Sequence, residues 1–145
     1  MARDRGPIKI MTNELLQMED IKLLVSIKSS PRHHKRQDAI RQTWGQSFID
    51  HGAEVFFTIS DQSCSNPYLD KDILHTPGID NHMGLTIRMI WLMYYLKDIE
   101  FSHVATIDDD CYVNVPLFMT LPWRESKLYG HNNGGYLAGC CTVWS

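Results

Sequence analysis

The stretch His103-Val104-Ala105-Thr106-Ile107-Asp108-Asp109-Asp110 decides how this chain of 145 residues folds. Its first five residues are rich in β-branched side chains, so it predicts a buried strand that ends in three aspartates. In extended backbone, Asp108 and Asp110 lie on one side of the chain and Asp109 on the other. Two carboxylates on one side suit a hard cation such as Mg²⁺ or Mn²⁺. A solvated acidic turn, or the cap of a following segment, is the alternative interpretation.

Two more strands are predicted upstream, and a helix follows each of them. Residues 21–27 and 55–59 are short apolar runs typical of buried strands. Between them, Ser30 is expected to cap a single helix that ends at residues 50–52. Its apolar stripe is Ile40, Trp44 and Phe48, which places Trp44 in the core and leaves Arg41 a structural role.

The second helix is expected to begin at Asp80 or Asn81, with its apolar stripe at Leu85, Met89, Leu92 or Met93, and Leu96. Before it, residues 71–74 are expected to form a short strand. After the aspartates, residues 111–115 are expected to be extended until Pro116 closes them. A turn at 132–135 and a last strand over 136–145 complete the chain.

Strands that alternate with helices predict an α/β fold with a mostly parallel sheet covered on both faces. Ligands of such sheets bind at the carboxyl ends of the strands. Three polar segments follow predicted strands here: 28–30, 60–62 and 108–110. Residues 1–20 read as a polar lead-in, and the predicted strands and helices fall within residues 21–145.

Composition excludes several classes of protein. The chain is 43% hydrophobic and 21% charged with a formal net charge of −3, so it lacks the basic surface expected for nucleic-acid binding. It contains no apolar run of membrane-helix length and no signal-peptide pattern. Its four cysteines form no C-x-x-C pair, and the disulfide state is left open for Cys64, Cys111, Cys140 and Cys141.

Four segments, in this order, resemble the motifs of the beta-1,3-galactosyltransferase family, whose wider relatives include Fringe-type and core-1 transferases. Residues 36–45 (RQDAIRQTWG) resemble its Ala-Ile-Arg-x-Thr-Trp-Gly helix, and residues 80–88 (DNHMGLTIR) resemble its Asp-x-Tyr-x-Asn-Leu-Thr-x-Lys segment. Residues 108–116 (DDDCYVNVP) are similar to its Asp-Asp-Asp-x-Phe/Tyr-Val-Asn-Val box. Residues 136–145 (YLAGCCTVWS) occupy the place of its glycine turn, with Cys140 and Cys141 where two glycines are usual.

This resemblance implies an enzyme with a GT-A-like Rossmann-type sandwich. The sandwich is expected to be incomplete here, with residues 21–145 as the N-terminal, donor-binding part of a glycosyltransferase domain. The implied reaction is a divalent-metal-dependent, inverting transfer of a hexose, galactose or an N-acetylhexosamine, from a UDP-sugar to a glycan hydroxyl. The metal is usually Mn²⁺, with Mg²⁺ as the other possibility. The acceptor glycan is carried by a glycoprotein or glycolipid. The family works in the Golgi lumen as membrane-anchored proteins, whereas this chain shows no membrane segment.

The resemblance also assigns roles to individual residues. Asp110, with Asp108, is assigned to the metal. The donor-binding residues are Arg36, Asp61, Asp80, Arg88, Asp108 and Asp109. Physically, an arginine near a strand end can hold a diphosphate with two parallel hydrogen bonds.

Each of these donor-binding residues has an ordinary alternative. Arg36 is otherwise a solvated residue on a helix, and Asp61 is otherwise a turn residue. Asp80 is otherwise a helix cap, and Arg88 belongs to the polar face of its helix. His33 and His34 are expected to be exposed, His131 to be a solvated loop residue, and His82 has no assigned role.

An inverting transfer needs a general base that takes the proton from the acceptor hydroxyl. The family supplies this carboxylate after the glycine turn, so it is expected to be missing from this chain. A donor-binding or interaction module without catalysis is therefore the alternative function. A phosphohydrolase that uses Asp108 and Asp110 is a third hypothesis, disfavoured because its nucleophile strand should come early in the domain.

Overall fold

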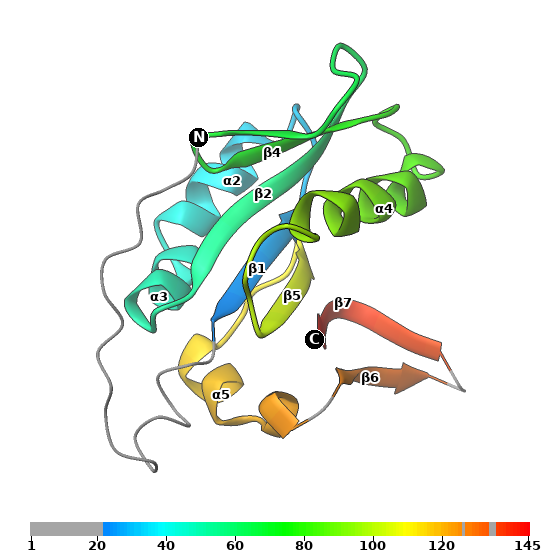
Figure 1. The fold of residues 1–145 in the computed structure, drawn as a ribbon. Coiled ribbons are helices and arrows are strands. Elements are labelled where there is room, and N and C mark those ends of the chain that lie inside the picture. The colour runs from blue at the N-terminus through cyan, green and yellow to red at the C-terminus, as the bar shows by residue number, and fades with distance from the viewer. Residues whose placement is uncertain (1–21, 126, 134–135) are drawn as a thin grey trace, which may run out of the picture.

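The computed structural model describes residues 22–125, 127–133 and 136–145. The expected lead-in and the centre of the expected turn at 132–135 lie outside these residues. Seven strands form one mixed sheet in the order β3-β4-β2-β1-β5-β7-β6 (Figure 1). The strands are β1 (Leu23–Lys28), β2 (Glu54–Asp61), β3 (Tyr68–Asp70), β4 (Ile73–Pro77), β5 (His103–Asp108), β6 (Leu128–Asn133) and β7 (Tyr136–Trp144).

The four adjacent strands β4, β2, β1 and β5 are parallel, which confirms the predicted α/β class. Strands β3, β7 and β6 extend the sheet in antiparallel fashion on its two sides. Pairing Lys28 of β1 with Asp108 of β5 brings their carboxyl ends level. The polar segments that follow β1 and β5 therefore start side by side.

Helices cover both faces of the sheet. They are α2 (His34–Arg41), α3 (Trp44–Asp50), α4 (Gly84–Leu96) and α5 (Val115–Thr120), with a 3-10 turn at Pro122–Glu125. Alternate residues of β1 face opposite layers, because strand side chains alternate. Val25 packs in the core that contains Trp44 and Phe48, and Leu24 packs in the core that contains Leu92 and Leu96.

The expected single helix over residues 30–50 is wrong in two respects. The helix begins at His34, because the Ser30 hydroxyl donates to Asp80 and accepts from the Arg32 amide instead of capping it. The helix is also divided, since Thr43 has non-helical dihedral angles (φ −127°, ψ −113°) between α2 and α3. Trp44 is buried, as expected, and Arg41 is structural: it pairs with Asp72 at 2.7 Å.

Three further expectations need correction. Residues 111–114 form no strand, and Pro116 opens a helix instead of closing a strand, because the Asn114 side chain accepts the Leu117 amide and caps α5. The short strand expected at 71–74 is a hairpin of β3 and β4. Strand β6 was not predicted, whereas β7 covers the expected last strand.

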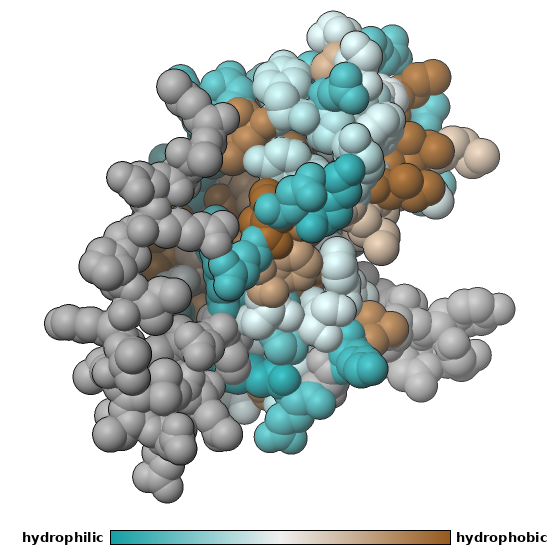
Figure 2. All heavy atoms as spheres, viewed as in Figure 1, coloured by the Kyte–Doolittle hydropathy of each residue, from teal (hydrophilic) through white to brown (hydrophobic). Residues whose placement is uncertain are grey.

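Helix α4 has an unusual distribution of polarity. Arg88 is its only charged residue and is 4% exposed, whereas Ile87, Ile90 and Met93 are about half exposed. Brown side chains accordingly gather over α4 in Figure 2. None of the helices in the described part of the chain combines the length and hydropathy that a membrane-spanning segment needs.

Candidate functional site

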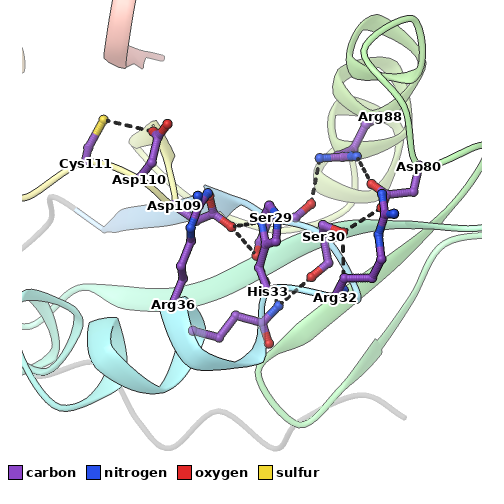
Figure 3. A network of polar contacts seen from close by, with 11 residues as sticks. Ser29, Ser30, Arg32, His33, Arg36, Asp80, Arg88, Asp109, Asp110 and Cys111 are labelled. Atoms are coloured by element: carbon purple, nitrogen blue, oxygen red, sulfur yellow. Dashed lines mark hydrogen bonds and ion pairs between the residues drawn. The ribbon is translucent and has the colours of Figure 1, made fainter.

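A cavity of about 450 Å³ opens where β1 and β5 end and α4 begins. Its polar lining converges from segments that are up to 80 residues apart (Figure 3). The charged and imidazole side chains that line it are Lys28, His33, Arg36, Asp80, His82, Arg88, Asp108, Asp109 and Asp110. The structure thus brings together all the expected site residues except Asp61.

Asp109 is the buried anion of this cavity. Its carboxylate accepts hydrogen bonds from the Ser29 hydroxyl at 2.7 Å and Arg36 Nη1 at 3.0 Å, and His33 Nδ1 lies 2.7 Å away. Burial alone would raise the pKa of Asp109, but the three hydrogen bonds outweigh burial and lower it. Asp109 therefore stays ionised and fixes the position of Arg36.

Asp80 and Arg88 form a second charged pair on the α4 side of the cavity. Arg88 donates to Asp80 at 3.2 Å, to the Ser29 carbonyl at 2.8 Å and to the Ser60 hydroxyl at 3.0 Å. Burial lowers the pKa of Arg88, and Asp80 works against that shift. Arg88 is not on the polar face of its helix, and Asp80 is not the helix cap. Helix α4 begins at Gly84, later than the expected start at Asp80 or Asn81, and the Gly84 amide donates to the Asn81 side chain just before the helix.

Asp108 and Asp110 lie together, as predicted, but the backbone is a turn and not the expected extended chain: β5 ends at Asp108, and the Cys111 amide donates to the Asp108 carbonyl at 3.3 Å. Their carboxylate oxygens and the Cys111 sulfur all lie within 4.8 Å of one another. Two carboxylates fit the oxygen preference of Mg²⁺ or Mn²⁺. Lys28 Nζ lies 2.8 Å from Asp108 Oδ1, so a cation bound there would share Asp108 with the Lys28 ammonium.

Asp61 lines a neighbouring cavity of about 500 Å³, which shares Asp80 with the first cavity. It accepts hydrogen bonds from the Ser63 hydroxyl and amide and lies 2.8 Å from His75 Nδ1. The two Ser63 bonds and then His75 lower the pKa of Asp61 to about 2. The Tyr68 ring stacks on His75 with centroids 4.5 Å apart.

Three residues at the site were not assigned a role from the sequence. His33 was expected to be exposed but contacts Asp109, because the helix starts three residues later than the Ser30-Pro31 signal implies. Ser29 donates to Asp109, and Gln37 donates to both Ser29 Oγ and the Ser30 carbonyl at 3.0 Å. Only the position of Ser29 after a strand could have indicated this role. The side chain of His131 lies outside the described part of the chain.

The described cysteines Cys64, Cys111 and Cys141 carry thiols and form no disulfide. Chemically, the cavity offers cationic nitrogens from Lys28, Arg36 and Arg88 beside a pair of carboxylates. Cationic nitrogens bind phosphate oxygens, and carboxylates bind the divalent cations that accompany phosphates.

Comparison with known proteins shows similarity to glycosyltransferases. Three similar curated proteins are N-acetylglucosaminyltransferases. The chain is 26% identical to a lactosylceramide 1,3-N-acetyl-beta-D-glucosaminyltransferase of Mus musculus over 76% of this chain and 34% of that protein. It is 27% identical to an acetylgalactosaminyl-O-glycosyl-glycoprotein beta-1,3-N-acetylglucosaminyltransferase of the same species, over 74% of this chain and 33% of that protein. It is 31% identical to a UDP-GlcNAc:betaGal beta-1,3-N-acetylglucosaminyltransferase 7 of Rattus norvegicus, over 66% of this chain and 29% of that protein.

The chain thus spans about a third of the length of these relatives. The sheet and its helices are consistent with a GT-A-like fold. A family model described as Fringe-like matches residues 16–131, which is most of the chain. By this match the chain belongs to the Fringe-like family, among the beta-1,3-glycosyltransferases.

Proposed function

We propose that this chain binds a UDP-sugar and a divalent cation in the cavity at the ends of β1 and β5, as the donor-binding part of a hexosyltransferase. The observation that carries the proposal is the arrangement of opposite charges on this cavity. Arg36 and Arg88 approach from its two sides, and Asp108 and Asp110 stand beside them. A diphosphate needs cationic partners and a metal, and this lining offers ligands for both.

Arg36 is the residue best placed for the diphosphate. Its side chain is 49% exposed, and its Nη1 lies 3.0 Å from the buried carboxylate of Asp109. An arginine has five N–H donors in a planar fork, so others remain for a phosphate. Arg88 is buried and already donates in three directions. It supports the cavity wall and adds positive charge more than it adds donors.

Asp108 and Asp110 are the proposed metal ligands. When bound there, Mn²⁺ or Mg²⁺ supplies positive charge that offsets the diphosphate. Lys28 holds Asp108 in place and contributes a further cation to the same edge. Asp109 is proposed to act through Arg36, since its oxygens are already engaged by three donors.

The proposed reaction is inverting transfer of the hexose to a glycan hydroxyl in a beta-1,3 linkage. The relatives' names support N-acetylglucosamine as the sugar, in preference to galactose. One of these names also states a UDP-GlcNAc donor and a beta-galactose acceptor. Donor binding without turnover is the competing outcome.

The test is calorimetric titration of the folded chain with UDP, with and without Mn²⁺. We expect Mn²⁺-dependent binding that Asp110→Ala removes and that Arg36→Ala weakens by about 10-fold or more, since each removes a charged contact. Asp98→Ala is the matched control, because Asp98 is an exposed carboxylate beyond the far end of α4. Its affinity should equal that of the wild type.

Two results would contradict the proposal. One is absence of UDP binding by a chain whose circular dichroism shows that it is folded. The other is binding that Asp98→Ala and Asp110→Ala change equally. Release of UDP from UDP-GlcNAc in the presence of a galactose-terminated acceptor then separates turnover from donor binding alone.

A further inference from the structure

A separate cavity of about 380 Å³ lies on the α2 side of Arg36. It is bounded by the junction of α2 and α3 and by the loop after β5. It shares Arg36, Asp109 and Asp110 with the proposed donor cavity. Its own lining includes Thr43, Trp44, Cys111 and Tyr112. The two cavities are therefore neighbours on either side of one row of charged residues.

The lining of this second cavity has the character of a sugar site. Tyr112 is 80% exposed, so its ring is available to a ligand, and buried Trp44 contributes to the cavity floor. A hexose ring has an apolar face of C–H groups and a rim of hydroxyls. An aromatic wall suits the apolar face, and a few polar groups at the edge suit the hydroxyls. Asp110 and the oxygen of the Thr43 hydroxyl supply such acceptors.

The order of the three cavities matches the order of groups in a nucleotide sugar, which is nucleoside, diphosphate and sugar. The cavity with Asp61 and His75 shares Asp80 with the donor cavity on one side. The cavity with Tyr112 shares Arg36 and Asp110 with it on the other side. Figure 3 shows Asp80 and Arg88 at one end of the network and Asp110 and Cys111 at the other, with Arg36 and Asp109 between them. A diphosphate at Arg36 would thus direct its sugar toward Tyr112.

We propose that the cavity lined by Thr43, Trp44 and Tyr112 is the subsite for the donor's hexose, with the sugar ring stacked on Tyr112. This inference rests on the proposed function, because it requires a UDP-sugar in the donor cavity. It adds a specificity-determining aromatic residue outside the aspartate triplet and assigns a ligand to a second cavity.

The experiment compares UDP with UDP-GlcNAc as ligands of the wild-type chain and of Tyr112→Ala, in Mn²⁺. We expect Tyr112→Ala to weaken UDP-GlcNAc binding by about five- to tenfold, the value of one aromatic stacking contact, and to leave UDP binding unchanged. Tyr112→Phe keeps the ring and should bind UDP-GlcNAc as the wild type does. Tyr94→Ala is the control for loss of an exposed tyrosine, because Tyr94 lies on α4 and is 49% exposed.

A second readout is saturation transfer in NMR. When the aromatic resonances of the wild type are irradiated, saturation should pass to the hexose protons of UDP-GlcNAc. This saturation transfer should be weaker in Tyr112→Ala. The test also distinguishes the donor's sugar from the acceptor's. If Tyr112→Ala weakens binding of lactose or N-acetyllactosamine but not of UDP-GlcNAc, the cavity takes the acceptor and the proposal is wrong.

The remaining outcomes are equally decisive. If the wild type binds UDP but Tyr112→Ala weakens UDP and UDP-GlcNAc alike, or neither of them, the hexose lies elsewhere while the proposed function stands. If the folded wild type binds neither UDP nor UDP-GlcNAc, the proposed function fails, and the hexose subsite fails with it.

Discussion

Asp109 and Asp110 are neighbours in the chain with opposite surroundings. Asp109 is 9% exposed and holds three donors, whereas Asp110 is exposed. We expect Asp109→Asn to reduce the free energy of unfolding by about 2–4 kcal/mol at pH 7, because it removes the charge that the donors stabilise. Asp110→Asn, one residue away, should cost about 0.5 kcal/mol or less. Urea denaturation measures both, and equal losses would contradict this assignment.

The lowered pKa of Asp109 predicts that the stability of the chain depends on pH. Because hydrogen bonds lower the pKa of Asp109 in the folded chain, the unfolded chain takes up this proton first as the pH falls. The stabilisation by Asp109 is therefore complete above an ordinary carboxyl pKa of about 3.9 and is lost as the pH falls through the lowered value. The difference in stability between wild type and Asp109→Asn should shrink below about pH 4. A difference that stays constant down to pH 2 would show that Asp109 stabilises the fold by packing alone.

The sequence predicted which residues gather at the site but not how their side chains pair. Asp109 is separated from Asp108 and Asp110, as the sequence predicted, although a turn after β5 and not an extended chain produces this separation. Nothing in the sequence reveals that Ser29, His33 and Arg36 meet Asp109, since the partners come from another strand and helix. Asp61 was grouped with the aspartates because it too follows a strand. It lies one cavity away, because β2 is the next strand beyond β1 in the sheet.

Helix α4 joins the site to the sheet through Arg88. We expect Arg88→Leu to destabilise the chain by about 3 kcal/mol, because it leaves Asp80 with less compensation and the Ser29 carbonyl without that donor. Ile87→Ala changes the adjacent residue, which is 46% exposed, and should cost about 1 kcal/mol or less. Chemical denaturation compares the two variants. A larger loss from Ile87→Ala would mean that the outward face of α4 is the stabilising one.

The register of α4 explains why the sequence alone does not decide the role of Arg88. The predicted stripe was Leu85, Met89, Leu92 or Met93, and Leu96. Leu92 and Leu96 are buried and Met89 packs against them, as expected, but the buried stripe continues through Arg88 and Gly84 in place of Met89 and Leu85. Both stripes have helical spacing. Hydrophobicity favours the first one because an arginine is rarely buried without a partner. The partner, Asp80, is held by Ser30 from the far side of the cavity, so only tertiary structure selects the second stripe.

The break between α2 and α3 depends on a close backbone approach at Gly45. A Cβ at this position would lie 2.7 Å from the Ile40 carbonyl oxygen, which is too close for any side chain. We expect Gly45→Ala to cost about 1–3 kcal/mol, because the helix junction must shift to relieve the overlap. Gln46→Ala, an exposed change in the same helix, is the control and should cost about 0.5 kcal/mol or less. Thermal unfolding of both variants checks this, and a stable Gly45→Ala would contradict the close approach.

For the molecule as a whole, the order of strands and helices was predictable but the edges of the sheet were not. The apolar runs of β1, β2 and β5 are strong because these strands are covered on both faces. Strand β6 (LYGHNN) has no such run, since among the described strands it lies at the edge of the sheet and pairs with β7. The parallel centre alone suffices to bring the ends of β1 and β5 together, so the site could be anticipated while the edge strand could not.

This topology makes a prediction about ligand binding that involves the whole chain. Three segments far apart in sequence, 28–36, 80–88 and 108–110, line one cavity, whereas helix α5 and the 3-10 turn after it do not. In hydrogen exchange at short labelling times, UDP with Mn²⁺ should slow exchange in all three segments together and leave residues 115–125 unchanged. Asp110→Ala should abolish the effect in all three at once, because they share one ligand. Protection of a single segment, or equal protection of residues 115–125, would show that UDP does not bind across the ends of β1 and β5.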